Sequence, residues 1–189
     1  MKKLPDLDTH IDVLYDIFNG RTKTQLLLTA IELKIFDYLT TPQSSEAVWA
    51  AYARSMANYE RGGTAQKMAA RVAQIDGFAS FEKMLDLGGG PGLHCIAIVA
   101  ENPGMKGVIF DRPAVVKVAE EFITEYEMED RVTTMAGYYV NDPIGEGYDL
   151  IWASATLNFV RADLATMFKK IHGPETGRGI CKSGRRHYP

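Results

Sequence analysis

Residues 84–93 read Met84-Leu85-Asp86-Leu87-Gly88-Gly89-Gly90-Pro91-Gly92-Leu93, and this stretch decides the fold of the 189-residue chain. An apolar run typical of a strand, expected over 83–87, leads through four glycines straight into a helical pattern over 93–101. Glycine permits positive φ in a tight turn and lets a ligand lie against bare backbone, and the helix N-terminus offers unpaired N–H groups. The stretch therefore predicts a strand, a cofactor-binding turn and a helix.

The glycine spacing narrows the kind of cofactor. It reads Gly-x-Gly-x-Gly, and Leu93 stands where the dinucleotide fingerprint has its last glycine. The acidic side chain of Asp86, just before the glycines, suits a cationic ligand better than a pyrophosphate. A nicotinamide-dependent oxidoreductase is therefore disfavoured.

A second acidic residue follows the glycines at a spacing that indicates its role. The run 107–111 reads as a strand that ends in Asp111, 23 residues after Gly88. An acid at the tip of the second strand of such a sheet can accept hydrogen bonds from both hydroxyls of a ribose. Asp111 is therefore the expected ribose ligand. In the alternative, Asp111 only caps the helix that begins near Pro113.

Downstream of Gly77, short β-type apolar runs alternate with helical patterns. Such alternation predicts parallel strands joined by right-handed crossovers, that is, a doubly wound α/β sheet. The expected strands are 83–87, 107–110, 131–136 and 148–154, and the expected helices are 93–101, 113–126 and 162–171.

The first eighty residues are predicted to be all-helical. Apolar residues recur every three or four positions over 25–39, Thr41-Pro42 interrupts the pattern, and it resumes up to the break at Arg61-Gly62-Gly63 and again over 64–75. An aromatic stripe at helical spacing more often belongs to a core or a dimer interface than to an acceptor pocket, but both alternatives stay open here. This stripe consists of Trp49, Tyr52, Met56 and Tyr59.

Composition excludes several classes of protein. The chain is 46% hydrophobic and 24% charged, with a net charge of -3, so it is an ordinary globular protein without the positive field that attracts nucleic acid. No apolar run of about 18 residues predicts a membrane span, and the acidic start predicts no secretory leader. Cys95, Cys181 and the histidines follow no metal-ligand or disulfide spacing. We expect a cytoplasmic protein without a metal or a membrane partner.

Three motifs together resemble the S-adenosylmethionine-dependent methyltransferases: the glycine stretch 86–92, Phe110-Asp111-Arg112-Pro113 and the run 145–152. More narrowly, they are similar to the small-molecule O-methyltransferases of plants and microbes that dimerise through an N-terminal helical region, whose start the run 29–39 resembles. The similarity covers about residues 10–40 and 60–171. The resemblance implies a Rossmann-like class I methyltransferase fold, S-adenosylmethionine as cofactor, methyl transfer to a small-molecule hydroxyl, and a homodimer.

The resemblance also implies the cofactor-binding residues. The glycine turn would pack on the methionine end of the cofactor, Asp111 would bind the ribose, and two tyrosines would flank the adenine. In place of the acid that the family usually carries after the third strand, this chain has Tyr138, whose ring could stack on adenine; alternatively, both tyrosines are strand-end aromatics. The implied residues are Asp86, Gly88, Gly89, Gly90, Asp111, Arg112, Tyr138, Tyr139 and Ala153.

No general base is nominated. Many plant relatives place a histidine soon after the fourth strand, where this chain has Leu157, and the amide of Asn158 is no base at neutral pH. Asp149 begins its strand, whereas ligands gather at the carboxyl ends of parallel strands. His94 could approach the cofactor, but a partly buried histidine that packs on the sheet is the favoured alternative.

The resemblance divides the chain into three regions. Residues 1–80 would form a shortened helical dimerisation region, 81–172 the S-adenosylmethionine-binding domain, and 173–189 a basic tail without apolar periodicity, expected to be disordered or aberrant. A complete family member would continue after Ile171 with further strands, so the C-terminal strands are expected to be missing. The alternative function is that of a catalytically inactive remnant that acts as a dimerising or regulatory scaffold.

Overall fold

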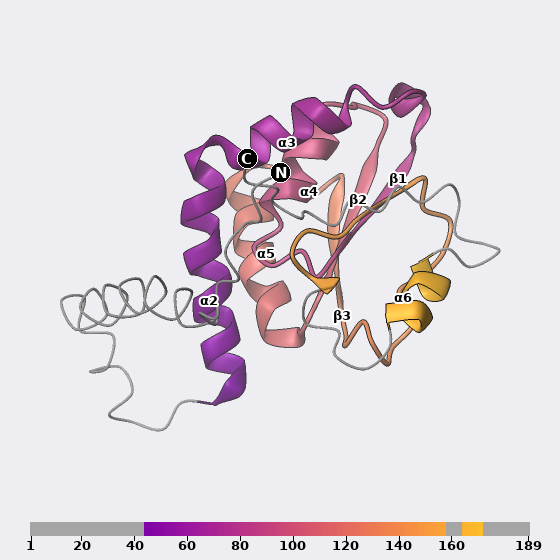
Figure 1. The fold of residues 1–189 in the computed structure, drawn as a ribbon. Helices are drawn as coiled ribbons and strands as arrows, with labels where there is room; N and C mark the ends of the chain where they lie inside the picture. The colour runs from indigo at the N-terminus through magenta and orange to yellow at the C-terminus, as the bar shows by residue number, and fades with distance from the viewer. Residues whose placement is uncertain (1–43, 158–163, 172–189) are drawn as a thin grey trace, which may run out of the picture. The chain divides into compact units, whose positions relative to one another are not determined.

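The structure is a computed structural model that describes residues 44–157 and 164–171 (Figure 1). Apart from Ser44, these residues belong to one compact unit. The expectations for residues 1–43, for Asn158 and for the tail 173–189 lie outside the described residues.

The centre of the fold is a four-stranded parallel sheet in the order β3-β2-β1-β4, which confirms the predicted fold class. Apolar side chains alternate between its two faces: Met84 and Leu150 belong to one buried cluster, and Leu85 and Ile151 belong to the other. Both faces are therefore covered. The strands are β1 (Lys83–Leu87), β2 (Lys106–Asp111), β3 (Val132–Ala136) and β4 (Leu150–Trp152).

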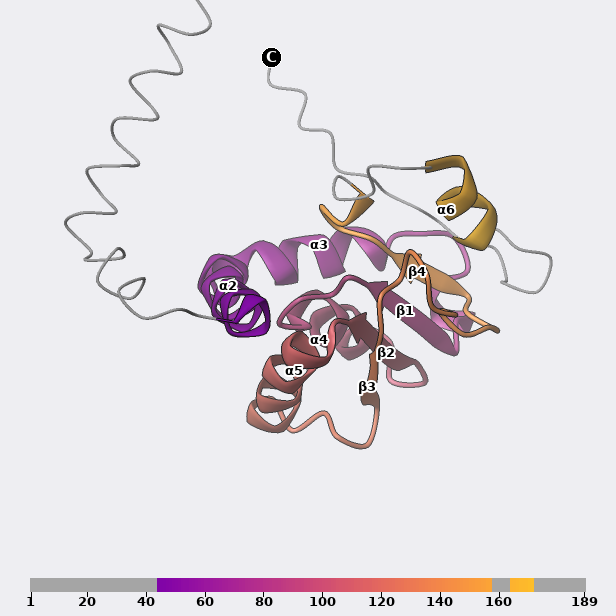
Figure 2. The ribbon, with the colours of Figure 1, turned by 90° about the horizontal axis from the view of Figure 1, so that it is seen from below.

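Helices cover the two faces as a doubly wound sheet requires. The helices α4 (Leu93–Ala100) and α5 (Pro113–Glu125) lie on one side of the strands, and α6 (Leu164–Ile171) lies on the other (Figure 2). Two buried residues of α6, Met167 and Ile171, belong to the second cluster. The strands and helices expected after Gly77 are thus present, with ends shifted by a few residues.

The fourth strand, Leu150–Trp152, is shorter at both ends than the predicted 148–154, and side chains just before it tie it to its surroundings. The Tyr148 hydroxyl donates to the Ile144 carbonyl at 2.9 Å, and the Asp149 carboxylate accepts from the backbone N–H groups of Glu82 and Lys83 at 2.8 and 3.0 Å. Asp149 therefore holds the start of β1, at the opposite end of the sheet from the glycine turn.

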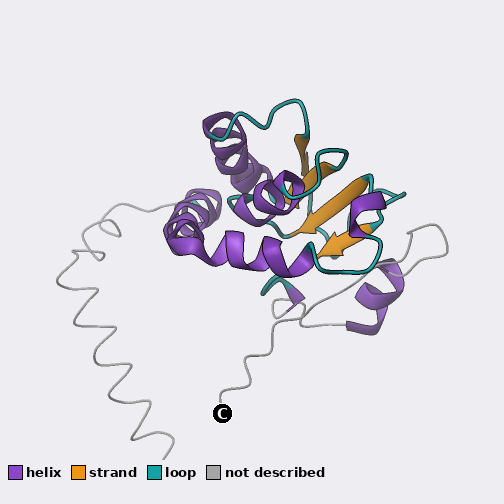
Figure 3. Cartoon of the chain, turned by 90° about the horizontal axis from the view of Figure 1, so that it is seen from above, coloured by secondary structure: helices purple, strands orange, loops and turns teal. Residues whose placement is uncertain are grey.

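Two further helices, α2 (Ser45–Tyr59) and α3 (Ala65–Val72), are present, as predicted from their periodicity, and pack on the helices that cover one face of the sheet. Helix α2 contacts α5 and α3 contacts α4. A π-helical turn, η2 (Glu60–Thr64), joins them, and Gly63 within it has a φ of 97°, so the chain bends there (Figure 3). A short 3₁₀ turn, η3 (Phe78–Ser80), leads into β1.

Small residues allow the close approach of these helices. Ala53 and Ala57 of α2 are 2% and 1% exposed, and ion pairs from Arg54 to Glu121 and from Arg61 to Glu125 link the same segment to α5. The larger side chains of α2 are thereby left to point elsewhere. Among the described helices, none combines the length and the apolar character needed to cross a bilayer.

Candidate cofactor site

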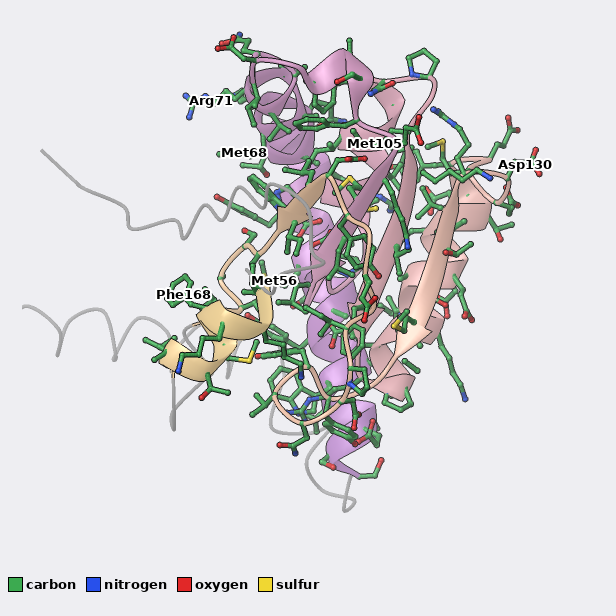
Figure 4. The ribbon with its side chains drawn as sticks, turned by 90° about the vertical axis from the view of Figure 1, so that its right-hand side faces the viewer. Met56, Met68, Arg71, Met105, Asp130 and Phe168 are labelled. Atoms are coloured by element: carbon green, nitrogen blue, oxygen red, sulfur yellow. The ribbon has the colours of Figure 1, made fainter. Side chains whose placement is uncertain are left out.

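A cavity of about 860 Å³ opens where β1, β2 and β4 end. The glycine turn after β1, the acid at the end of β2 and the loop after β4 form one wall of it. The other wall comes from α2, η2 and α3, and includes Met56, Met68 and Arg71, which are labelled in Figure 4. The carboxyl ends of parallel strands thus meet the helical segment around one enclosed space, the usual location of a ligand in such a sheet.

The glycine turn has a packed side and an open side. Gly88 has a φ of 68°, and a Cβ atom there would lie 2.5 Å from the methyl group of Thr156. Gly90 has a φ of 56°, lines the cavity, and a Cβ atom there would meet nothing within 4 Å. Backbone is therefore exposed to the cavity at Gly90, as a ligand-binding turn requires.

Asp111 touches this turn directly. Its Oδ2 accepts a hydrogen bond from the Gly90 N–H at 2.9 Å, and its Oδ1 accepts one from the Arg112 N–H at 2.7 Å. Burial raises the pKa of Asp111, and these two N–H groups and the Arg112 charge oppose that rise. Each carboxylate oxygen can accept a further hydrogen bond, so Asp111 can still bind hydroxyl groups of a ligand.

Aromatic rings surround the next residue. The Arg112 guanidinium lies 4.4 Å from the centre of the Trp49 ring and 5.5 Å from that of Tyr138. Tyr139 lines the cavity and its hydroxyl donates to the Thr156 carbonyl at 3.2 Å. The loop that carries both tyrosines is held from α6, because the Lys170 ammonium donates to the Tyr139 carbonyl at 2.7 Å. This side of the cavity can receive a flat ring system.

Charged side chains are buried in the wall on the other side of the glycine turn. Asp86 and Glu60 are 2% and 6% exposed, and the Glu60 Oε1 lies 3.5 Å from the Nδ1 of His94. Burial, helped by the charges of Glu60 and Asp111, raises the pKa of Asp86 to about 7 against the opposing effect of His94. Burial lowers the pKa of His94, but Glu60 and Asp86 outweigh it, so that this pKa is raised.

Three polar atoms in this part of the wall have no hydrogen-bond partner among the described residues. They are Glu60 Oε2, Asp86 Oδ2 and Trp152 Nε1. All three residues line the cavity. Because buried polar groups are nearly always satisfied, a ligand or water is expected to supply their partners.

Seven of the nine residues implied by the resemblance line this one cavity. The other two are close to it: Ala153 is 1% exposed in the core beside the lining residue Ser154, and Tyr138 is 45% exposed next to Arg112. The seven are Asp86, Gly88, Gly89, Gly90, Asp111, Arg112 and Tyr139. Leu157, at the position of the plant histidine, is a buried core residue.

Sequence patterns favour other roles for several residues that the structure brings to the cavity. His94 packs against Trp152, with ring centres 5.8 Å apart, but it also lines the cavity. The aromatic stripe of α2 lines it too, which is the less favoured of the two alternatives. No sequence pattern identifies Glu60 as a site residue, because only the glycine break after it indicates a bend. In the described part of the chain, no group of three or more His, Cys, Asp or Glu side chains could hold a metal ion.

Comparison with known proteins agrees with this geometry. The family model of the O-methyltransferase domain matches residues 16–179. An uncharacterized protein of Methanocaldococcus jannaschii is 36% identical over 101 residues, which are 53% of this chain and 27% of that protein. The 3-hydroxy-5-methyl-1-naphthoate 3-O-methyltransferase of Streptomyces sahachiroi is 30% identical over 95 residues, which are 50% of this chain and 26% of the enzyme.

A solved structure is similar over a longer stretch. An O-methyltransferase family 2 protein from Planctomyces limnophilus, in complex with apigenin, is 25% identical with a TM-score of 0.58, over 76% of this chain and 44% of that one. The chain therefore spans less than half the length of each of these relatives. Since the family model covers more than half of the chain, the chain belongs to the O-methyltransferase domain family.

Proposed function

We propose that this chain binds S-adenosylmethionine in the 860 Å³ cavity and serves methyl transfer to a small-molecule acceptor, most directly to a hydroxyl group. The single observation that carries the proposal is the contact of the glycine turn with the strand-end acid, from Gly90 N to Asp111 Oδ2 at 2.9 Å. One nucleoside could touch both groups at once. Family membership supports the class of reaction.

The residues present fit this cofactor. Asp111 would bind the ribose hydroxyls, the bare backbone at Gly90 would lie against the chain that leads to the sulfur, and Tyr139 with Arg112 would face the adenine. Three carboxylates in the cavity wall, those of Glu60, Asp86 and Asp111, favour a ligand with positive charge. Bound S-adenosylmethionine supplies a methyl group on a positively charged sulfonium.

The helical wall would bind the acceptor. Its aromatic and methionine side chains offer an apolar surface that excludes water and aligns a ring-bearing molecule with the donor. Arg71 adds a positive charge on the same wall. The contacting side chains are Trp49, Tyr52, Met56, Tyr59 and Met68.

The cellular setting and assembly are part of the proposal. We propose a cytoplasmic homodimer whose region 1–80 supplies the dimer contacts, whose region 81–172 binds the cofactor, and whose residues 173–189 form a tail outside both. Large apolar side chains of α2 that are 49–53% exposed, namely Val48, Tyr52 and Tyr59, support a protein contact through this region. The net charge of -3 supports a small-molecule acceptor over nucleic acid.

The test is calorimetric titration of S-adenosylhomocysteine into the purified chain. We expect saturable binding that Asp111→Ala abolishes, because this variant removes both acceptors for the ribose. Asp130→Ala is the matched control, because Asp130 is exposed and lies on the far side of the molecule from Met68 and Arg71 (Figure 4).

A thermal scan gives a second readout. Ligand at about a hundred times its Kd should stabilise the fold by about 2.7 kcal/mol. Absence of both heat and a rise in melting temperature would refute cofactor binding and favour the inactive scaffold, for which the replacement of the plant histidine by Leu157 is the supporting observation.

A further inference from the structure

Glu60 is a buried acid where the helical segment bends. Its side chain is 8% exposed, whereas that of its neighbour Arg61 is 38% exposed. Gly63, three residues after Glu60, has a φ of 97°, so the chain is kinked between α2 and α3, and Glu60 lines the cavity at this kink. A carboxylate is almost never buried without a partner, so its place in this wall needs an explanation.

The pair with His94 provides a partner for only one of the two carboxylate oxygens of Glu60. Oε1 lies 3.5 Å from His94 Nδ1, while Oε2 has no partner among the described residues. Asp86 Oδ2, in the same wall, also has no partner among the described residues. Both residues line the same cavity, and burying carboxylates without donors is costly.

The third unsatisfied atom is a donor, Nε1 of Trp152, whose ring lies against that of His94. A ligand group that offers N–H donors with positive charge to the two carboxylates, and an acceptor to the indole, would satisfy all three atoms. The amino-acid end of a molecule, with an ammonium beside a carboxylate, has both. A neutral hydroxyl would leave the two carboxylate charges uncompensated.

We propose that Glu60 binds the ammonium group at the amino-acid end of the cofactor, so that the helical segment is itself part of the cofactor site. This inference rests on the proposed function. His94 is the positioning residue that holds the Glu60 carboxylate by its other oxygen. Asp86 faces the same ammonium from the sheet.

The test compares one ligand that has the amino-acid end with one that lacks it. S-adenosylhomocysteine carries the ammonium, and 5′-methylthioadenosine has the same nucleoside and sulfur without the amino-acid end. For Glu60→Gln, which keeps the shape and removes the charge, we expect S-adenosylhomocysteine to bind about tenfold to hundredfold more weakly, because a charge-assisted hydrogen bond is lost. Binding of 5′-methylthioadenosine should stay within about twofold.

The matched control is Glu121→Gln, the same change at an exposed acid of α5 that pairs with Arg54. It should leave the Kd of both ligands unchanged. If Glu60→Gln loses its cooperative thermal transition, the same pair of ligands is measured on Glu60→Asp. That variant should also weaken S-adenosylhomocysteine selectively, because the shorter side chain withdraws the carboxylate.

The outcomes separate the two proposals. Suppose that the wild-type chain binds both ligands. If the Glu60 variants weaken both ligands equally, Glu60 has a structural role, and if they weaken neither, Glu60 does not contact the cofactor. Either result overturns the inference, while the proposed function stands. If the wild-type chain binds neither ligand, the proposed function fails and this inference fails with it.

Discussion

Replacing Asp86 by asparagine is expected to stabilise the fold at pH 8. The carboxyl is 2% exposed, and burial raises its pKa to about 7 from 3.8. Between these two values the folded state holds a proton that the unfolded state releases. The stability that this group contributes is therefore fully present below about pH 4 and is lost as the pH rises through 7.

The size of the effect follows from the two pKa values. A gap of about three units, at about 1.4 kcal/mol per unit, means that the ionised carboxylate costs about 4 kcal/mol above pH 8. Between pH 5 and pH 8 the wild-type chain should lose about 2–3 kcal/mol through this group alone. Asparagine has the same shape and no charge, so Asp86→Asn should be free of this loss.

Urea unfolding followed by circular dichroism at pH 5, 6.5 and 8 measures the difference. The gain of Asp86→Asn over the wild type should grow by about 2–3 kcal/mol from pH 5 to pH 8. Asp130→Asn, at an exposed position, is the control and should show no such growth. A gain that is the same at all three pH values would refute the assignment of a raised pKa to this buried group.

Three other perturbations have defined outcomes. The affinity for S-adenosylhomocysteine should rise about tenfold from pH 6 to pH 8, because Asp86, with its pKa of about 7, must ionise to bind the cationic group; a flat calorimetric profile would contradict this. Asn102→Ala should lower the free energy of unfolding by about 2–3 kcal/mol, since its amide donates to the Phe78 and Phe81 carbonyls, and exposed Asn141→Ala should not. Gly107→Ala should cost about 1–3 kcal/mol in urea unfolding, because its Cβ would lie 2.4 Å from Cys95 Sγ; an unchanged midpoint would show that the core relaxes around it.

The stability cost of Asp86 has a functional counterpart. An ionised carboxylate that destabilises the free protein is well suited to bind a cationic ligand, because the ligand's charge compensates the buried carboxylate and restores the stability that the free protein lacks. Stability and binding should therefore change in opposite directions in Asp86→Asn, as is common for residues in functional sites.

The sheet could be predicted because its determinants are local. The apolar run of β1, the four glycines and the resumed helical period all lie within a few residues of one another, and parallel strands bring their carboxyl ends to one edge. That rule places Gly90 beside Asp111 without coordinates. The length of β4 could not be predicted, because an apolar run does not show where backbone pairing with the neighbouring strand stops.

The helical wall shows the limit of such reasoning. The spacing of Trp49, Tyr52, Met56 and Tyr59 identifies one face of a helix, but no periodicity says what that face meets. Packing decided it: Ala53 and Ala57 allow α2 to approach α5, and the aromatic side chains are left to line the cavity.

A parallel α/β sheet with a glycine turn and a carboxylate at neighbouring strand ends follows from the amino-acid sequence alone, because short-range periodicity and glycine geometry encode both. That Glu60, His94 and Asp86 share one buried wall follows from long-range packing. Their charges come from three separate segments, and whether a charge is buried or solvated depends on what the rest of the chain packs around it.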